Sequence, residues 1–192
     1  MSRRLVVGIS GASGAVYGIR ALELLAAMDD VETHLIVSAG ARTTIAMETD
    51  RTARELTELA DVTHSETNLA ASISSGSFQT DGMLIAPCSI KTLSAIANSF
   101  ADNLLARAAD VTLKERRPLV LLFRETPLHV GQIRLMLQAS EAGATLMPPV
   151  PAFYHRPSSV EEIVDQTVGR ALDQLGLNPD VVSRWSGRPP SS

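Results

Sequence analysis

Several residues that could do chemistry come directly after short apolar runs. Ser10 and Ser13 lie in a glycine-rich loop behind the first run, and the residues from Ser89 to Thr92 follow a later one. Arg124 and Glu125 come after the most continuous apolar run of the chain. An arginine can bind a phosphate group, and a glutamate beside it can transfer a proton. Small hydroxyls, cations and one carboxylate in such positions favour a phosphorylated ligand.

The glycine-rich loop has the spacing Gly-x-x-Gly-x-x-Gly over Gly8, Gly11 and Gly14. Together with the apolar run before it and the Ala/Leu-rich run after it, this pattern predicts a buried strand, a tight loop and a helix start. The free backbone N–H groups at a helix start and the positive end of the helix dipole favour an anion, usually phosphate. The spacing is not the strict Gly-x-Gly-x-x-Gly, so the loop alone identifies no nucleotide. A turn that packs and binds nothing stays an alternative.

The other residues also have interpretations without a ligand. Ser89 fits a helix N-cap, a role that does not prevent a ligand contact. Arg124 and Glu125 could form a surface ion pair. Lys91 at a helix start opposes the helix dipole, and this small cost is easier to understand if an anion or a carboxylate lies nearby. Lys114 fits a solvated helix end, because a cation suits a helix C-terminus.

Composition limits the class of protein. The chain has 192 residues, 45% of them hydrophobic and 20% charged, which is typical of one globular domain with a sizeable core. A net charge of −4 argues against a general nucleic-acid binder or a membrane-surface protein. The single cysteine, Cys88, excludes an internal disulfide, and the four histidines share no metal-ligand spacing. No apolar run approaches the roughly 20 residues of a membrane span, and the first strand leaves no room for a signal peptide, so we expect a cytoplasmic protein.

Apolar runs alternate with helical patterns, which favours an α/β fold around a parallel sheet. The expected strands are residues 4–9, 32–37, 61–64, 82–86, 119–123 and 145–147. The expected helices are residues 14–28, 41–48, 52–60, 90–98, 102–114, 130–141 and 159–175, with one helical turn near 70–74. Thr52 and Glu55 have the spacing of a capping box. No second domain is visible, and the tail from residue 178 is expected to be extended.

The carboxyl ends of parallel strands form the edge of a sheet where ligands bind. The predicted strands bring the glycine loop, Ser38, Ser89 and Arg124 to that edge, together with Tyr154 in the segment after the last strand. The sequence therefore predicts one cleft to which several distant segments contribute.

Two classes of nucleotide-binding protein fit poorly. Nicotinamide-dependent dehydrogenases usually place an acidic residue after the second strand to bind the ribose, and residues 37–40 contain none. A Tyr-x-x-x-Lys pair is also missing, because Ala21 follows Tyr17 and Ser158 follows Tyr154 at that spacing. No Gly-x-x-x-x-Gly-Lys-Ser/Thr loop is present, which argues against an NTPase.

Six motifs, in this order, resemble the UbiX-type flavin prenyltransferases, a family formerly described as aromatic-acid decarboxylases. The resemblance covers roughly Leu5 to Trp185, and several long motifs in order are far more specific than the glycine loop alone. The motifs are GISGASG at 8–14, SGSFQTDGM at 75–83, APCSIKT at 86–92, RAADVTLKE at 107–115, RETPL at 124–128 and PPVPAFY at 148–154.

This resemblance implies a single-domain, three-layer α/β/α Rossmann-like fold with a mostly parallel sheet. Residues 1–177 would form the FMN-binding flavoprotein domain and residues 178–192 an extended C-terminal tail. The implied reaction joins the dimethylallyl group of dimethylallyl monophosphate to N5 and then C6 of reduced FMN, without a metal. The product, prenylated FMN, would serve a UbiD-type decarboxylase. The implied assembly is a homo-oligomer, a dodecamer, whose site lies between subunits.

The resemblance also assigns roles to residues that match the family's motifs. Glu125 is the expected proton-transfer residue, with Ser13 beside flavin N5. The residues expected to contact FMN are Gly11, Ala12, Ser13, Ser38, Ser89, Ile90, Lys91, Thr92 and Arg124. The residues expected to bind the prenyl donor are Lys114, Arg124, Tyr154, Arg170 and Trp185.

The chain departs from the family pattern in three places. Ile90 stands where methionine is common, Phe123 precedes Arg124 where a smaller residue or proline is expected, and residues 129–134 differ. The last departure would suit a branch paired with a hydroxyaryl-acid decarboxylase, so an FMN-binding accessory subunit is one alternative. The other is a flavin-dependent cysteine decarboxylase of the same fold. That group needs a histidine after an early strand and an asparagine-bearing loop, and residues 87–92 do not match such a loop.

Overall fold

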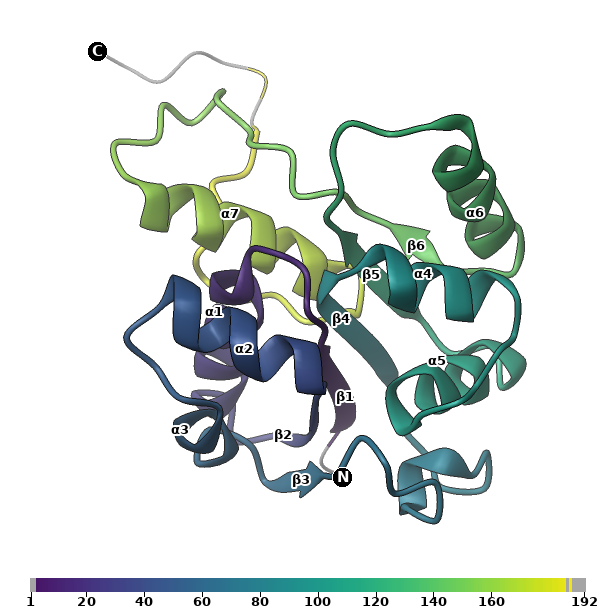
Figure 1. Cartoon of the computed structure of the whole chain (residues 1–192). Coiled ribbons are helices and arrows are strands. Elements are labelled where there is room, and N and C mark those ends of the chain that lie inside the picture. The colour runs from purple at the N-terminus through teal and green to yellow at the C-terminus, as the bar shows by residue number, and fades with distance from the viewer. Residues whose placement is uncertain (1–2, 186, 188–192) are drawn as a thin grey trace.

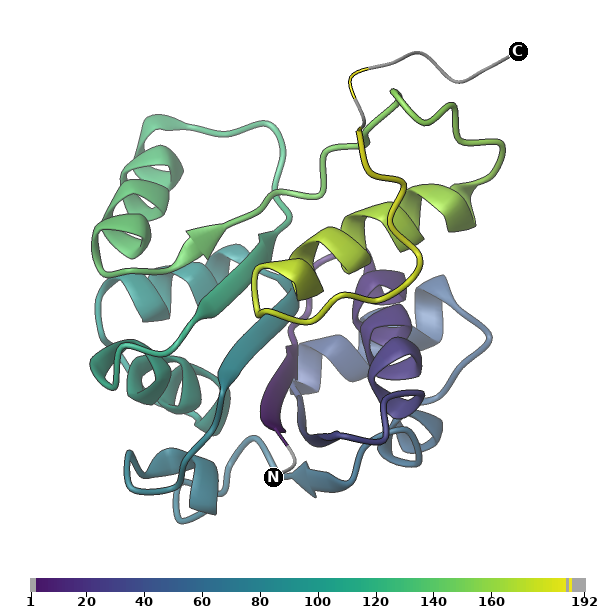
Figure 2. The same ribbon diagram turned by 180° about the vertical axis from the view of Figure 1, so that it is seen from behind.

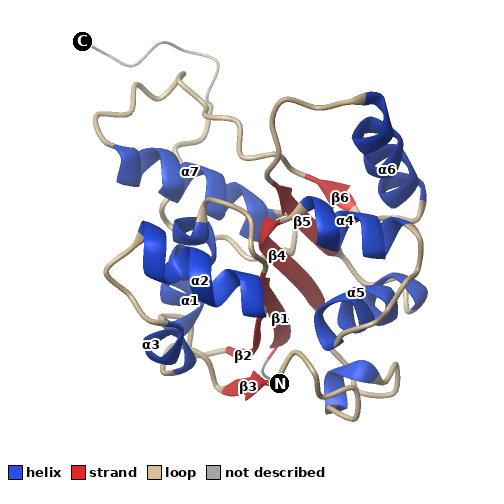
Figure 3. Cartoon of the chain, in the orientation of Figure 1, coloured by secondary structure: helices blue, strands red, loops and turns tan. Residues whose placement is uncertain are grey.

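In the computed structural model, which describes residues 3–185 and 187, six strands form one sheet (Figure 1, Figure 3). The strands follow the order β3-β2-β1-β4-β5-β6, and every neighbouring pair is parallel. The chain moves outward in one direction from β1 to β3 and in the other from β4 to β6, so the order reverses between β1 and β4. The strands are β1 (Arg3–Ile9), β2 (Val31–Val37), β3 (Val62–His64), β4 (Gly82–Cys88), β5 (Leu119–Phe123) and β6 (Thr145–Leu146).

Helices cover both faces of this sheet, as the two opposite views show (Figure 1, Figure 2). One face packs against α1, α2, α3 and α7, and the other against α4, α5 and α6. The expected three-layer Rossmann-like fold is therefore confirmed. The helices are α1 (Ala15–Ala26), α2 (Ala39–Glu48), α3 (Ala53–Thr57), α4 (Ile90–Ala97), α5 (Leu104–Lys114), α6 (Val130–Glu141) and α7 (Val160–Asp173), with the 3-10 turn η1 (Ser72–Ser74).

The alternation of side chains along the strands divides the core into two layers. In β5, Val120 and Leu122 join the core under α1 and α7, whereas Leu119, Leu121 and Phe123 join the core under α4 and α5. Successive side chains in a strand point to opposite faces, so a strand covered on both faces must be apolar throughout. This explains why the most continuous apolar run of the sequence is a strand inside the sheet.

Most of the expected elements are present within a few residues. Thr52 and Glu55 form the expected capping box at α3. The fourth strand was expected to stop at Ala86, but β4 continues through Pro87 to Cys88. Its pairing with β5 shifts in register between Ile85 and Cys88, and Cys88 then pairs with Phe123. A proline has no N–H for a strand ladder, and this irregularity accommodates it within the strand.

Within residues 3–185 and 187, no helix is long and apolar enough to cross a membrane. The same part of the chain holds no cluster of three or more His, Cys, Asp or Glu side chains placed to bind a metal ion. Cys88 is fully buried, and burial raises the pKa of its thiol far above the usual range, which is typical of a packed, unreactive cysteine.

Candidate functional site

The ends of the central strands are tied together where the strand order reverses. The buried Ser10 hydroxyl donates to the Pro87 carbonyl at 2.7 Å and accepts from the Ser89 backbone N–H at 2.7 Å. The Ser38 N–H donates to the Ile9 carbonyl at 3.0 Å, which joins the end of β2 to the end of β1. In open parallel sheets a ligand crevice forms at such a reversal. The distant segments therefore meet at one edge, as the sequence predicted.

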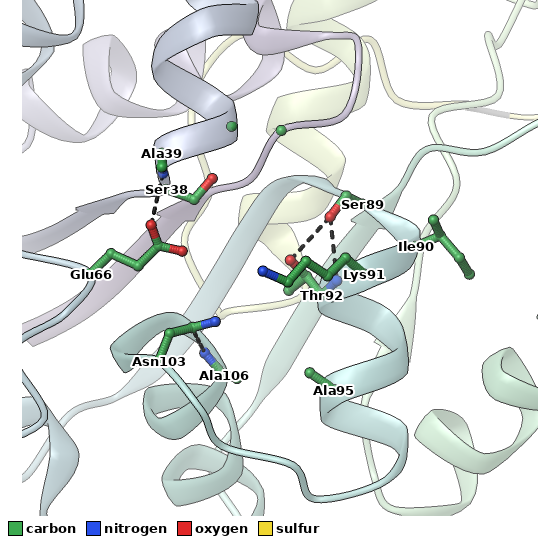
Figure 4. Close-up of a pocket in the computed structure, with 12 residues that line it drawn as sticks. Ser38, Ala39, Glu66, Ser89, Ile90, Lys91, Thr92, Ala95, Asn103 and Ala106 are labelled. Atoms are coloured by element: carbon green, nitrogen blue, oxygen red, sulfur yellow. Dashed lines mark hydrogen bonds between the residues drawn. The ribbon is translucent and has the colours of Figure 1, made fainter.

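A pocket of about 350 Å³ opens at this edge, and we call it the switch-point pocket (Figure 4). It lies between the glycine loop, the start of α2 and the starts of α4 and α5. Most of the residues expected to contact FMN line it, whereas Ala12, Ser13 and Arg124 do not. The lining residues are Gly11, Ser38, Ala39, Gly40, Glu66, Ser89, Ile90, Lys91, Thr92, Ala95, Asn103 and Ala106.

Three helices begin at the switch-point pocket, but they differ in what their first N–H groups bind. At α2, the Glu66 carboxylate accepts from the Ala39 N–H at 2.7 Å. At α5, Asn103 caps the helix, and the Leu104 N–H donates to the Glu66 carbonyl at 2.8 Å. Each of these helices leaves one N–H of its first turn, that of Gly40 or Leu105, without an acceptor in the described part of the chain, whereas α4 leaves two consecutive ones, those of Ile90 and Lys91. The start of α4 is thus the helix end best suited to bind an anion.

Ser89 is the N-cap of α4, with its hydroxyl accepting from the Thr92 N–H at 3.3 Å. Its hydroxyl also lies 3.1 Å from the Thr92 hydroxyl. The expected capping role is therefore confirmed. Capping uses only one of the free N–H groups of the first turn, so it leaves the others for a ligand.

The start of α1 is occupied differently from what the glycine loop suggested. Glu48, at the end of α2, accepts from the Gly14 N–H at 2.8 Å and from the Ala15 N–H at 3.1 Å. Gly14 itself has φ of 102°, which favours glycine, and Gly11 lies so close to the backbone of Gly40 that a Cβ would approach it to 2.9 Å. Because a carboxylate of the chain already uses these two N–H groups, they are not free to bind a ligand phosphate.

Glu48 is a site residue that the sequence reasoning missed. Burial acts to raise its pKa, but hydrogen bonds from Ser13, Gly14 and Ala15, with the charge of Arg124, hold the pKa below its usual value. The hydrogen bond between Gly14 and Glu48 joins positions 34 residues apart, so no local sequence pattern predicts it. Glu48 stays ionised at neutral pH and places a negative charge beside the Ser13 hydroxyl.

We expect Glu48→Gln to lower the free energy of unfolding at pH 7 by about 0.5–1 kcal/mol, because a neutral amide interacts less with a helix start. The lowered pKa of Glu48 adds stability above its unfolded pKa, near 4.3, and this stability is lost as the pH falls through the folded value. The difference between variant and wild type should therefore shrink below about pH 4. Urea denaturation at both pH values measures it, with the exposed Glu58→Gln as the control. A difference that does not change with pH would contradict this account.

Arg124 and Glu125 follow β5 at the same edge of the sheet. The Arg124 N–H donates to the Cys88 carbonyl at 3.0 Å, which ties this segment to the end of β4. In the described chain the two side chains form no ion pair with each other, so the surface-pair alternative is wrong. Burial raises the pKa of Tyr17, and the charge of Arg124 opposes this. The charge of Arg124 therefore acts on Tyr17 of α1 and on Glu48 of α2.

Tyr154 and Trp185 meet beside α7. Their rings pack edge to face, with centroids 5.9 Å apart. The Tyr154 hydroxyl accepts from the Gln166 side-chain amide at 2.7 Å. One turn further along α7, Arg170 donates to the Asp173 carboxylate at 2.6 Å. Three of the residues expected to bind the prenyl donor, Tyr154, Arg170 and Trp185, therefore lie along α7. Their contacts involve Gln166 and Asp173, which the sequence reasoning did not name.

Lys114 is not part of this arrangement in the single chain. It is the last residue of α5, at the end of the sheet where β5 begins, whereas Glu125 follows the other end of β5. Its ammonium pairs with Glu115 and lies beside Gly76. Within one subunit, Lys114 cannot join the other residues that were expected to bind the donor.

Comparison with known proteins identifies relatives over almost the full length. The family model described as Flavoprotein matches residues 1–171. The flavin prenyltransferase UbiX of Escherichia coli (strain K12) is 62% identical over 187 residues, covering 96% of this chain and 99% of the relative. Among solved structures, AnUbiX (PadA1) in complex with FMN and dimethylallyl pyrophosphate has a TM-score of 0.96 at 49% identity, covering 98% of this chain and 100% of that chain.

A second solved structure, a dodecameric FMN-dependent UbiX-like decarboxylase from Escherichia coli, has a TM-score of 0.94 at 49% identity. It covers 96% of this chain and 100% of its own. The high identity, the nearly complete coverage of both chains and the matching fold agree with the six motifs. The chain belongs to the UbiX-type flavin prenyltransferases, within the flavoprotein family.

Proposed function

We propose that this flavin prenyltransferase joins the dimethylallyl group of dimethylallyl monophosphate to N5 and then C6 of reduced FMN, in a site built from the residues described above. The observation that carries the proposal is the start of α4, where two free N–H groups and Lys91 face a pocket beside the glycine loop. These donors suit the polar, phosphorylated part of FMN. Residues 38–40, directly after β2, contain no aspartate or glutamate that would bind a dinucleotide ribose, and the Glu66 carboxylate that lines the pocket follows β3 and accepts from the Ala39 N–H.

FMN would extend from the switch-point pocket toward the glycine loop. Ser38, Ser89 and Thr92 offer hydroxyls along the pocket, and Ile90 offers an apolar contact. Ala12, Ser13 and Arg124, which lie outside the pocket lining, would contact the isoalloxazine end. This assignment agrees with the finding that Glu48, rather than a ligand phosphate, uses the N–H groups at the start of α1.

The prenyl donor would bind on the other side of Arg124, near α7. Tyr154, Arg170 and Arg124 can donate hydrogen bonds to its phosphate, and Trp185 adds an aromatic surface. As the allylic C–O bond breaks, negative charge develops on the phosphate. Fixed arginine and tyrosine donors stabilise that charge without a metal ion. Lys114 would complete the group from a neighbouring subunit.

When bound, reduced FMN supplies the nucleophilic atoms N5 and C6. Glu125, placed after Arg124 at the carboxyl end of β5, would donate a proton to the leaving phosphate or remove one from N5 or C6. Ser13 would lie beside N5. Its hydroxyl interacts with the ionised Glu48, so it can hold a proton at that position and pass it on.

A homo-oligomer, with the dodecamer as its expected size, fits the surface of this chain. Val130, Ile133 and Leu137 form an apolar stripe along α6, and each is more than half exposed. A contiguous apolar stripe on a helix is typical of a subunit contact. The UbiX-like relative from Escherichia coli is dodecameric. Such an assembly would also bring Lys114 of one subunit to the site of another.

The product would be passed to a UbiD-type decarboxylase. A cytoplasmic location suits this role, because a reducing compartment keeps the lone cysteine reduced. We further propose residues 1–177 as the flavoprotein domain and residues 178–192 as its C-terminal tail. Residues 186 and 188–192 lie outside the described part of the chain.

Anaerobic incubation with reduced FMN and dimethylallyl monophosphate tests the proposal. The expected product is a flavin heavier by one dimethylallyl unit, detected by mass spectrometry, that activates a UbiD-type apo-decarboxylase. A parallel reaction with dimethylallyl diphosphate shows which of the two phosphates the enzyme uses as prenyl donor. Recovery of unchanged FMN from both reactions would overturn the proposal and favour the accessory-subunit alternative.

A further inference from the structure

Gln166 connects the tyrosine of the donor site to the C-terminal tail. It lies on α7 and is only 4% exposed. Its side-chain Nε2 donates to the Tyr154 hydroxyl at 2.7 Å and to the Ser183 carbonyl at 3.2 Å. Its Oε1 accepts from the Ser183 N–H at 2.9 Å. One buried amide thus binds both backbone groups of Ser183 and the oxygen of Tyr154.

The same contacts determine where the proton of Tyr154 points. A tyrosine hydroxyl has one proton to donate and can accept at its oxygen. Here the proton goes to the Ser183 carbonyl at 3.0 Å, and Gln166 donates to the oxygen. If the proton turns toward a phosphate, the Ser183 carbonyl still has Gln166 as a donor. The turn therefore leaves no acceptor unpaired, which would otherwise be costly.

The tail is also held at the residues that follow Ser183. Arg184 makes two hydrogen bonds of 2.9 Å to the Asp173 carboxylate, which Arg170 shares. Hydrogen bonds from Arg184 and Arg170 outweigh burial and keep the pKa of Asp173 below its usual value. Trp185 then packs against Tyr154. Gln166 binds both the tyrosine hydroxyl and Ser183, which also bond directly to each other.

We propose that Gln166 is a positioning residue for prenyl transfer: it fixes the oxygen of Tyr154, leaves its proton free to turn to the donor phosphate, and docks the tail through Ser183. This inference rests on the proposed role of Tyr154 at the donor phosphate. Gln166 itself does not contact the reacting atoms.

A double-mutant cycle on the full-length enzyme tests the proposal. We expect Gln166→Met to raise the KM for dimethylallyl monophosphate roughly tenfold, the effect of losing about one hydrogen bond, with the Kd for FMN unchanged. In a Tyr154→Phe background the same change should have an effect of less than about twofold, because the hydroxyl it acts through is gone. Gln166→Glu should not rescue the KM, since a carboxylate accepts the tyrosine proton instead of donating to the oxygen. The control is Gln174→Met, an exposed glutamine just after α7.

Trp185 is the only tryptophan of the chain, so its fluorescence gives a readout without activity. In flavin-free protein, Gln166→Met should lower the fluorescence anisotropy of Trp185 as the tail loosens, and Gln174→Met should not. Three outcomes would each overturn the role of Gln166. The fold-changes in KM of the two single variants could multiply in the double variant, or Gln166→Met could weaken FMN binding as much as it raises the KM. The third is an anisotropy of Trp185 that Gln166→Met leaves unchanged. A wild-type enzyme that does not prenylate FMN would instead overturn the proposed function. An unchanged KM for dimethylallyl monophosphate in Tyr154→Phe would overturn the role of Tyr154.

Discussion

Replacing Glu125 with glutamine is expected to slow prenyl transfer roughly a hundredfold to ten-thousandfold, the usual range for loss of a general acid–base group. The substitution keeps the size and hydrogen-bonding shape of the side chain but removes its ability to exchange a proton. Glu125 forms no ion pair within the described chain, and its Oε1 accepts only from the Thr126 N–H at 3.1 Å. The fold should therefore not depend on its charge, and FMN should bind as in the wild type.

Rapid-mixing anaerobic kinetics measure the rate of transfer, and flavin absorbance or fluorescence measures the Kd for FMN. Glu141→Gln is a matched control, because Glu141 is an exposed glutamate at the end of α6, outside the site. If Glu125→Gln released FMN as strongly as it slowed transfer, Glu125 would have a structural role instead. A rate within about threefold of wild type would remove Glu125 from the proton-transfer step.

Lys114→Gln is expected to lower prenyl transfer roughly tenfold to a hundredfold, because a charge-assisted hydrogen bond to phosphate is lost. This is a large effect for a residue that, within one chain, lies at the opposite end of β5 from Glu125. Lys114 pairs with Glu115 on an exposed surface, and such a pair adds little to stability. The loss should therefore appear in the KM and rate for the donor and not in the unfolding free energy.

Mixing subunits separates a site within one chain from a site between chains. Lys114→Gln and Glu125→Gln chains are unfolded together, refolded and compared with each variant alone. If one subunit supplies Lys114 and its neighbour Glu125, random mixing restores roughly a quarter of the sites. No recovery in mixed oligomers, confirmed by differently tagged chains, would show that both residues act within one chain. Wild-type activity of Lys114→Gln alone would exclude Lys114 from the site.

The order of elements was predictable because each depends on local chemistry. The apolar run 119–123 can be stable only if both faces are covered, so it reads as an inner strand without any knowledge of its neighbours. Thr52 and Glu55 cap α3 through contacts between residues three positions apart, and this spacing can be recognised in the sequence. The end of β4 was missed because Pro87 usually stops a strand, and only the shifted pairing with β5 lets it continue.

The candidate site was predictable to the extent that it follows the ends of parallel strands. The switch-point pocket joins Ser38 and Ser89 for this reason, since the carboxyl ends of β2 and β4 must share one edge. Glu48 and Gln166 were not predictable, because their partners lie elsewhere along the chain, and of the two partners of Asp173 only Arg170 is local while Arg184 lies in the tail. Their residue types are common on helices, and no spacing distinguishes them there.

By itself, the sequence determined the α/β fold, the edge at which the ligand site forms, the family, and the residues that could carry phosphate binding and proton transfer. These conclusions depend on local patterns and on motifs that stay together along the chain. Only the tertiary structure decided which helix start is open to an anion. Glu48 accepts from the Gly14 and Ala15 N–H groups at α1 and Glu66 from the Ala39 N–H at α2, whereas the Ile90 and Lys91 N–H groups at α4 have no acceptor in the described chain. It also placed Lys114 apart from the other donor-site residues, because side chains from separate elements meet only when the sheet and its helices are packed.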